Sequence, residues 1–290
     1  MNKNTLSKRN KWQGRAWELD LLRGICILFV ALDHTMYDIN GILNGTWSAS
    51  GIPALVKAVD FASLYWLSPV RDSWRPIIIY IFFIVAGICT SFCRSNFKRA
   101  LKLAAVALML TLITYLANVV TKTDGFLIVF GVLHCLASCM LIYSLMNQLL
   151  NFITKKNHVL KATILFTLGL LITQLYKVYF VEPVNAGYLS VSENNSFIWG
   201  LFFYNQKVWS MTSDYFPIAP YIGWFLIGAA IGVAFYQKRK SLLPALNRKW
   251  HFPLTIPGRH SLFVYLGVRV IEMGILALIT YLAIGSFNFL

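Results

Sequence analysis

The sequence has 290 residues, of which 58% are hydrophobic and only 13% are charged. A soluble domain of this length needs a charged surface, and this composition does not supply one. A soluble globular fold is therefore excluded, and a membrane protein is expected.

Seven apolar stretches follow one another along the chain. Each has roughly the 20 residues that cross a bilayer core of ~30 Å as a helix. They span residues 17–39, 76–93, 101–120, 126–150, 160–180, 215–236 and 261–284. These runs are longer than strands, and they lack the alternation of an outer-membrane barrel. We therefore predict an all-α polytopic membrane protein with about seven transmembrane helices.

The basic residues between these stretches fall mainly on one side of the membrane, which predicts a cytoplasmic N-terminus by the positive-inside rule. The outer loops then hold only Lys57, Arg71, Arg75, Lys122 and Lys207. The cytoplasmic segments hold Lys3, Lys8, Arg9, Lys11, Arg15, Arg94, Lys98, Arg99, Lys102, Lys155, Lys156, Lys161, Lys238, Arg239, Lys240, Arg248, Lys249 and Arg259. The net charge of +15 is thus mostly a topology signal. It favours membrane lipids as partners and gives no support to a nucleic-acid partner.

The chain is predicted to form one membrane domain, because no internal repeat or soluble domain is visible. Residues 1–16 form a basic cytoplasmic segment, and residues 17–290 form a single transmembrane domain. No cleavable signal peptide is evident, since the first apolar stretch contains Arg23 and no small-residue cleavage site follows it. Two outer loops, 40–75 and 181–214, are long and aromatic. Sugar stacking and anchoring at the membrane interface are both suitable roles for their residues Trp47, Trp199 and Trp209.

The first helix carries a stripe of polar residues, although a charge at the bilayer centre costs at least ~2.5 kcal/mol. Arg23 and His34 are 11 residues apart, so at 100° per residue their side chains lie within about 20° of each other around the helix axis. The stripe consists of Asp20, Arg23, His34, Tyr37 and Asp38. A stripe facing lipid would be too costly, so it faces a protein interior or a water-filled tunnel. The alternative is an Asp20–Arg23 pair at the interface, with His34 a buried and satisfied histidine.

A second histidine, His134, shares a face of the fourth helix with Gly131 and Ser138. If this helix enters from outside near Phe126, His134 lies about 12 Å deep by helical rise. That depth is comparable with the depth of His34, so the two histidines could line one cavity. Packing between helices is the alternative role for His134.

Ser91 and Arg94 share one face at the end of the second helix, and the loop that follows adds Lys98, Arg99 and Lys102. This group could bind a phosphorylated ligand. It could equally serve only to anchor the loop on the cytoplasmic side.

The last two predicted helices contain two further features. Gly228 and Gly232 have the spacing of a small-xxx-small packing face. Arg269 and Glu272 are three residues apart near mid-membrane, and they suit an ion pair that is either structural or part of a tunnel lining.

The motifs along nearly the whole chain resemble those of a known family. The first helix is similar to that of bacterial membrane proteins related to heparan-α-glucosaminide N-acetyltransferase. It reads Arg15-Ala-Trp-Glu-Leu-Asp-Leu-Leu-Arg23-Gly-Ile-Cys-Ile-Leu, followed by Asp33-His34 and Tyr37-Asp38. Its Arg-to-His spacing also resembles that of the broader transmembrane acyltransferases that O-acetylate surface glycans. Further matches are Phe83-Ile-Val-Ala-Gly-Ile-Cys-Thr-Ser91, Phe130-Gly-Val-Leu-His134, Asp214-Tyr-Phe-Pro-Ile-Ala-Pro-Tyr-Ile-Gly-Trp and Gly258-Arg-His-Ser-Leu-Phe-Val-Tyr-Leu266.

The resemblance implies an enzyme of the bacterial cytoplasmic membrane. It would take an acetyl group from cytoplasmic acyl-CoA and deliver it to a sugar or glycan outside. Acetyl-CoA is then the co-substrate, no metal is expected, and a homodimer is left open. The nucleotide end of CoA is polyanionic, which suits a basic cytoplasmic mouth. The residues assigned to donor binding are Asp20, Arg23, Ser91, Arg94, Lys98 and Arg99.

The catalytic roles are expected at four residues. His34 would act as the general base, because the pKa of a histidine lies near the operating pH without a large perturbation. Asp38, one turn away, would orient the ring or stabilise the imidazolium. His134 or Ser138 would donate a hydrogen bond to the carbonyl oxygen as negative charge develops there. An acetyl-histidine intermediate is the main variant.

A transporter or flippase is the alternative function, because a polar stripe through a helical bundle also suits a proton-coupled carrier. Against it, the chain shows no inverted repeat and no pair of Gly/Pro-broken helices in corresponding halves. A non-catalytic membrane partner would leave the stripe without a purpose. The sequence does not determine whether the acceptor atom belongs to a hydroxyl or to an amine.

Overall fold

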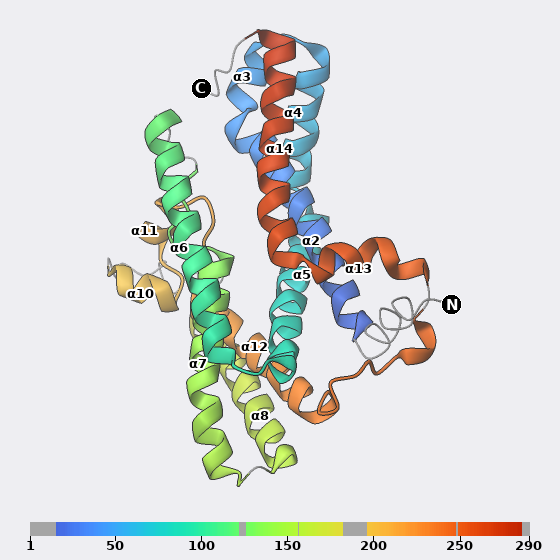
Figure 1. Cartoon of the computed structure of the whole chain (residues 1–290). Coiled ribbons are helices and arrows are strands. Elements are labelled where there is room, and N and C mark those ends of the chain that lie inside the picture. Colours follow the sequence, from blue (N-terminus) through green and yellow to red (C-terminus); the bar gives the residue numbers. More distant parts are fainter. Residues whose placement is uncertain (1–15, 122–125, 156, 182–195, 248, 286–290) are drawn as a thin grey trace. The chain divides into compact units, whose positions relative to one another are not determined.

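The computed structural model describes residues 16–121, 126–155, 157–181, 196–247 and 249–285 (Figure 1). These residues are mostly helical and contain no strand, apart from an isolated bridge between Phe130 and Tyr215. The predicted cytoplasmic segment 1–16 lies outside the described residues except for Ala16. The predicted loop cations Lys122, Lys156 and Arg248 lie outside them as well.

Six helical stretches in the described part are long and apolar enough to cross a membrane. They are α5 (Pro69–Ile88) continued by η2 (Cys89–Phe92), α6 (Asn96–Thr121), α7 (Val132–Ile153), α8 (His158–Tyr176) continued by η3 (Lys177–Val181), α12 (Ile218–Phe235) and α14 (Ser261–Ile284). The predicted all-α polytopic membrane fold is therefore confirmed.

The remaining predicted span is α2 (Trp17–Tyr37). It has 21 residues, which is long enough to cross a bilayer, but its charged side chains set it apart from the six apolar helices. The count of seven spans and the cytoplasmic N-terminus stay predictions.

Shorter helical elements fill most of the connections in the described residues. They are η1 (Asp38–Ile42), α3 (Asn44–Ala49), α4 (Pro53–Trp66), α10 (Phe197–Phe202), α11 (Gln206–Ser210), η4 (Pro244–Leu246), η5 (Lys249–His251) and α13 (Phe252–Arg259). The long outer loop predicted at 40–75 is thus largely helical, and α5 begins at Pro69 rather than at residue 76.

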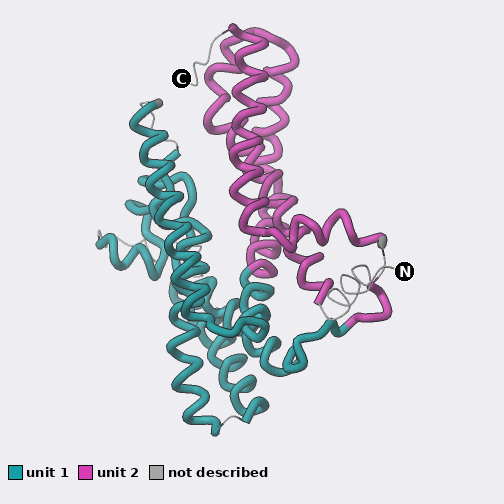
Figure 2. The backbone as a smooth tube through the Cα atoms, viewed as in Figure 1, with its two compact units in different colours: residues 1–15, 83–242 teal, residues 16–82, 243–290 magenta. Residues whose placement is uncertain are grey.

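The chain divides into two compact units (Figure 2). Unit 1 comprises residues 1–15 and 83–242, and unit 2 comprises residues 16–82 and 243–290. The assignment of residues 17–290 to a single domain stays a prediction.

Unit 1 is organised around α12, where glycines let neighbouring helices approach closely. A methyl group on Gly228 would lie 2.0 Å from the carbonyl oxygen of Ile84 in α5. A methyl group on Gly169 of α8 would lie 2.7 Å from the carbonyl oxygen of Gly223. A side chain at either position would hold the helices apart. The predicted packing role of Gly228 is therefore confirmed. Together, the close contacts at Gly228 and Gly169 hold α5 and α8 against α12.

In unit 2, α2 and α13 cross at two glycines. A methyl group on Gly24 would lie 1.8 Å from a backbone oxygen of α13, and one on Gly258 would lie 1.7 Å from a backbone oxygen of α2. Beside this crossing, the rings of Trp17 and His251 stack with centroids 4.2 Å apart. Trp17 also donates from Nε1 to the carbonyl oxygen of Leu243 at 3.0 Å. These contacts hold the start of α2 against the segment that follows α12.

Another part of unit 2 buries α3 and α4 against α14. Its core consists of Ile39, Leu43, Trp47, Leu55, Val59, Ala62 and Leu276. Trp47 is 2% exposed, and its Nε1 donates to Thr280 Oγ1 at 2.9 Å. Trp47 is therefore a core residue, and both roles considered for it, sugar stacking and interfacial anchoring, are wrong.

Candidate functional site

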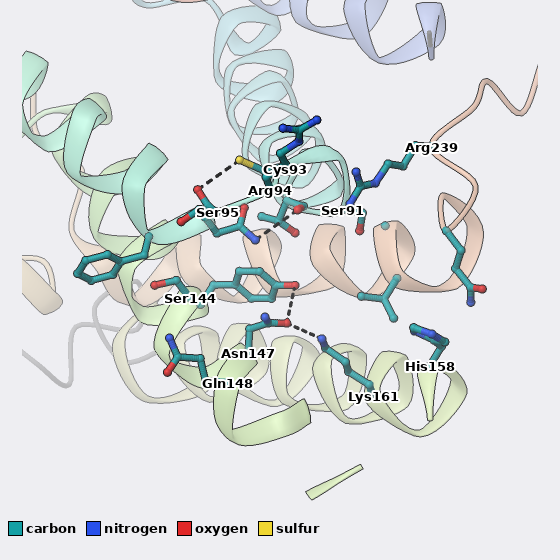
Figure 3. A pocket seen from close by; sticks show the side chains of 17 residues that line it. Ser91, Cys93, Arg94, Ser95, Ser144, Asn147, Gln148, His158, Lys161 and Arg239 are labelled. Carbon is teal, nitrogen blue, oxygen red and sulfur yellow. Dashed lines mark hydrogen bonds between the residues drawn. The ribbon is translucent and has the colours of Figure 1, made fainter. Parts of the chain in front are cut away.

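A pocket of about 630 Å³ lies at one end of unit 1 (Figure 3). Its walls come from η2 and the loop after it, the start of α6, the C-terminal half of α7, the start of α8 and the end of α12. The lining residues are Thr90, Ser91, Cys93, Arg94, Ser95, Asn96, Phe97, Tyr143, Ser144, Asn147, Gln148, His158, Lys161, Gly232, Val233, Gln237 and Arg239. These segments adjoin three of the predicted cytoplasmic loops, so under the predicted orientation the pocket faces the cytoplasm.

Among the residues that the structure describes, the pocket lining carries basic groups and no carboxylate. Arg94, Arg239 and His158 are exposed, and Lys161 is buried. Asp214 is the one acidic residue that the structure describes within residues 83–242, and it lies at the opposite end of α7 from the pocket. The described residues of unit 1 therefore place no carboxylate beside the positive charge of the pocket, and this favours an anionic ligand.

Two helix N-termini add to the positive potential of the pocket. Ser95 Oγ accepts a hydrogen bond from the backbone of Lys98 at the start of α6, at 3.3 Å. Asn157 caps α8 in the same way, accepting from Leu160 at 3.1 Å. The first turns of both helices line the pocket, and each N-terminus is equivalent to roughly half a positive charge.

Lys161 is held in a defined position by amide side chains. Its side chain belongs to α8, and the residue is only 8% exposed. Its Nζ donates to Asn147 Oδ1 and, at 2.7 Å, to Asn151 Oδ1, both on α7. The hydroxyl of Tyr143 donates to the same Asn147 oxygen at 3.4 Å. In Figure 3, Lys161 and Asn147 lie on one side of the pocket, opposite the arginines.

Two of the six residues predicted to bind the donor line this pocket, namely Ser91 and Arg94. Lys98 and Arg99 lie in the first turn of α6 and do not line it. Arg99 instead donates from Nη1 to the carbonyl oxygen of Cys89 at 3.5 Å, which ties α6 to η2.

The other two predicted donor-binding residues, Asp20 and Arg23, lie on α2 in unit 2. Asp20 sits between two arginines, with Oδ1 3.8 Å from Arg23 Nη1 and Oδ2 3.5 Å from Arg259 Nε. Arg259 belongs to α13, so this cluster reinforces the crossing of α2 and α13. The ion pair between Asp20 and Arg23, which the sequence offers as the alternative to a functional role, is present. A role of these two residues in donor binding stays a prediction.

His34 lies on α2 and is half-buried. Its ring faces that of Tyr265 on α14 edge-on, with centroids 6.3 Å apart. Neither ring nitrogen of His34 makes a hydrogen bond with another residue of the described ranges. The ring is therefore not engaged by a hydrogen bond within the described part of the chain.

Asp38 has a different environment, although it follows His34 by one helical turn. It is completely buried, and both of its oxygens accept from Arg269 of α14, at 2.6 and 3.2 Å. Glu272 Oε2 lies 3.7 Å from the same guanidinium. The predicted Arg269–Glu272 pair is thus the weaker part of a three-residue cluster. The predicted orienting contact of Asp38 with His34 is replaced by one with Arg269.

Asp33 lies off the predicted stripe, and it is the centre of a second polar cluster in unit 2. Its Oδ1 accepts from Arg71 Nε at 2.7 Å and from the Tyr65 hydroxyl at 3.0 Å, while Oδ2 accepts from Arg75 Nε at 3.0 Å. The Arg71 guanidinium lies 3.7 Å from the centre of the Trp66 ring. Burial and the Asp33 charge raise the pKa of Tyr65 well above its usual range, so its hydroxyl remains a donor.

His134 in unit 1 is buried, and its ring contacts the hydroxyl of Thr111. Thr111 Oγ1 lies 2.8 Å from the carbonyl oxygen of Ile128 and 3.0 Å from His134 Nε2. A hydroxyl that gives its one hydrogen to Ile128 would accept a hydrogen bond from Nε2–H, whereas one that donates to Nε2 would leave the ring hydrogen on Nδ1. Nδ1 has no hydrogen-bond partner among the described residues. The donor role of His134 stays a prediction.

The start of α7 is set by a contact between two of the quoted motifs. Asp214 Oδ2 accepts from the backbone N–H of Val132 at 3.1 Å, and a methyl group on Gly131 would lie 2.4 Å from the same oxygen. The helix therefore begins at Val132 and not at residue 126. Ser138, one turn after His134, is half-buried. His34 and His134 belong to different units, so their sharing of one cavity stays a prediction.

Comparison with known families decides the assignment. The family model described as heparan-α-glucosaminide N-acetyltransferase, catalytic, matches residues 15–270. The chain belongs to this family. The resemblance expected from the motifs is confirmed, and the match runs through both units. Comparisons with curated proteins and with solved structures found no match.

As a member of this family, the protein is a membrane acetyltransferase, and the transporter alternative is not favoured. The acetyltransferase family implies an acetyl donor and a glycan acceptor in general terms. No cluster of three or more His, Cys, Asp or Glu side chains that could hold a metal ion occurs in the part of the chain that the structure describes.

Sequence reasoning missed Lys161 as a site residue and interpreted it only as a cytoplasmic anchor. A signal was present, because this lysine lies inside the apolar stretch 160–180 rather than in the loop. Asn147 and Asn151, one turn apart in the preceding helix, are a second signal. Their significance depends on α7 and α8 lying side by side, which a one-dimensional pattern does not show.

Proposed function

We propose that this membrane acetyltransferase takes its acetyl group from acyl-CoA and transfers it to a hydroxyl or amine of a sugar on the outer side of the bacterial cytoplasmic membrane. The observation that carries the proposal is the unit 1 pocket, which is lined by basic groups without any carboxylate. The nucleotide end of CoA bears several phosphates, and arginine and lysine are the side chains that bind phosphate best.

His34 is proposed as the general base. It accepts the proton of the acceptor O–H or N–H, while the acceptor oxygen or nitrogen forms a bond to the thioester carbonyl carbon. The carbon–sulfur bond then breaks, and the proton passes to the sulfur, which leaves as the CoA thiol. The free ring nitrogens of His34 support this role, because a base needs an unengaged lone pair.

Asp38 is proposed as a positioning residue for His34. Its two hydrogen bonds with Arg269 fix the end of α2 and the start of η1 against α14. The carboxylate therefore acts on the histidine through the backbone and through its charge, and not by a direct hydrogen bond.

Ser138 is proposed as the donor to the carbonyl oxygen, in preference to His134. A serine hydroxyl can donate in its neutral state, whereas Nε2 of the His134 ring is already engaged with Thr111. His134 would then help to hold α7 against α6, where Thr111 lies.

A thermal-shift titration of the detergent-purified protein with acetyl-CoA tests the donor assignment without knowledge of the acceptor. Ligand at 100 times its dissociation constant adds about 2.7 kcal/mol of stability, which is a measurable shift. The shift should weaken in Arg94→Ala and persist in Lys207→Ala, a control at an exposed lysine of a predicted outer loop. No shift at millimolar acetyl-CoA would contradict the proposal.

A further inference from the structure

We infer that Lys161 is the residue that selects the phosphate-bearing end of the donor, with Asn147 and Asn151 holding its ammonium in place. The inference rests on the proposed function, because it assigns a phosphate subsite within the same pocket. It concerns a lysine that the sequence pattern marks only as a cytoplasmic anchor.

The first argument is the unusual burial of a positive charge. Lys161 is only 8% exposed, whereas the other basic residues of the lining are exposed. A buried ammonium normally has a carboxylate partner, because an unpaired buried charge is costly. Among the described residues, no carboxylate lies within ion-pair distance of Lys161, and unit 1 offers only the distant Asp214.

The second argument is the geometry of the ammonium group. An ammonium has three N–H donors, and two of them go to Asn147 Oδ1 and Asn151 Oδ1. Neutral amide oxygens orient the group without cancelling its charge. The third N–H remains for a ligand, and Lys161 lines the pocket. This arrangement keeps a full positive charge at a fixed place in the pocket wall.

The third argument is the positive potential of the groups around Lys161 in the pocket. The N-termini of α6 and α8 both contribute residues to the lining, and their partial charges add to that of Lys161. A phosphate ester or diphosphate placed there would complete the charge balance. The exposed Arg94 and Arg239 would attract the anion from solution, an effect that salt screens, while the buried Lys161 would determine how tightly it is held.

The test compares two donors, acetyl-CoA and acetyl-pantetheine, which lacks the nucleotide and its phosphates. Dissociation constants are measured by calorimetry on the purified full-length protein and on Lys161→Met, Lys161→Arg and Asn147→Asp. Lys155→Met is the matched control, because Lys155 is an exposed lysine in the turn that precedes α8. Melting temperatures without ligand check that each variant is folded.

Lys161→Met should weaken acetyl-CoA binding by 10-fold or more and leave acetyl-pantetheine binding unchanged. Its melting temperature without ligand should not fall, because the substitution removes an unpaired buried charge. Asn147→Asp should also weaken acetyl-CoA binding, since its carboxylate would neutralise the ammonium. Lys161→Arg should retain part of the affinity. The loss of acetyl-CoA affinity in Arg94→Ala, relative to wild type, should be smaller at high salt than at low salt. The loss of affinity in Lys161→Met should be the same at both salt concentrations.

Two results would overturn the inference, and they can be told apart. If the wild type binds acetyl-CoA and Lys161→Met binds it equally well, the subsite is wrong and the proposed function stands. If the wild type binds no acetyl-CoA, the proposed function fails as well. A lipid phosphate is the other source of the same chemistry. If phosphatidylglycerol in the micelle, and not acetyl-CoA, gives the Lys161-dependent stabilisation, the donor assignment is overturned in favour of a lipid site.

Discussion

His34 and Asp38 lie one helical turn apart at the end of α2, yet their surroundings give them different chemical capacities. The ring nitrogens of His34 have no hydrogen-bond partner in the described residues, which supports the proposed role of this ring as the base. Asp38 is bound at both oxygens by Arg269, so it is a structural anion. At the scale of single residues, this difference favours His34 over Asp38 as the proposed base.

The first prediction concerns His34. His34→Gln should lower acetyl transfer by about 10²–10⁴-fold, the usual contribution of general base catalysis, and leave the affinity for acetyl-CoA unchanged. Initial rates with labelled acetyl-CoA and a binding titration provide the two readouts. His260→Gln, at an exposed histidine, is the control. Transfer within a few-fold of wild type in His34→Gln would exclude His34 as the base.

The second prediction concerns the Asp38–Arg269 pair. Removing one partner of a buried pair strands the other charge, so Asp38→Asn and Arg269→Met should each destabilise the protein by about 3–5 kcal/mol. The double variant removes both charges and should lose less than the sum of the two. Melting temperatures of the three variants test this. Strict additivity would show that the two residues do not interact.

At the scale of elements, glycines decide which helices can touch. Gly228 and Gly232 show a local spacing that predicts their packing role, and α12 contacts α5 there. Gly24 and Gly258 are far apart in sequence, and neither has a repeat that marks it. Their contact becomes visible only once α2 and α13 are seen to cross.

The third prediction follows from this contrast between glycines. Gly228→Ala should destabilise unit 1 by about 1–3 kcal/mol, because the added methyl group would collide with the carbonyl oxygen of Ile84. Gly274→Ala in α14 should be neutral or stabilising, since nothing lies within 4 Å of its added methyl group and alanine favours helix. Apparent melting temperatures compare the two. Equal effects would contradict the close packing of α5 and α12.

The fourth prediction is a pH dependence at the contact between Trp17 and His251. Burial, and secondarily the charge of Arg259, lower the pKa of His251 below its ordinary value of 6.5. The unfolded chain then binds the proton more readily, so stability is full above pH 6.5 and is lost as the pH falls toward the lowered pKa. The melting temperature should drop between pH 7 and pH 5, and His251→Leu should reduce that drop. An identical drop in the variant would exclude His251 as the source.

At the scale of the whole molecule, the spans and the fold class could be predicted because apolar length is a local sum over the chain. The family could be recognised because its motifs are local too. The partner of Arg269 could not be predicted, since Asp38 is brought to it only by the packing of α2 on α14. For the same reason, Ser91 and Arg94 were identified as candidate pocket residues from their own helix, while Lys161 on another helix was not.

The distribution of charge over the molecule is also informative. Except for Asp214, the acidic residues that the structure describes belong to unit 2, whereas basic residues occur in both units. The described part of unit 1 therefore suits the anionic donor that we propose. The polar clusters of unit 2, built on Asp20, Asp33 and Asp38, are internally paired and position α2.

The most direct test of the account is sided acetyl transfer in inside-out membrane vesicles, which expose the cytoplasmic face and keep the native acceptor inside. Labelled acetyl-CoA is added outside, and the luminal glycans and lipid-linked sugars are analysed. We predict label in a luminal product with the wild-type protein and at least 100-fold less with His34→Gln. No luminal label with the wild type, or equal label in the two, would contradict the account.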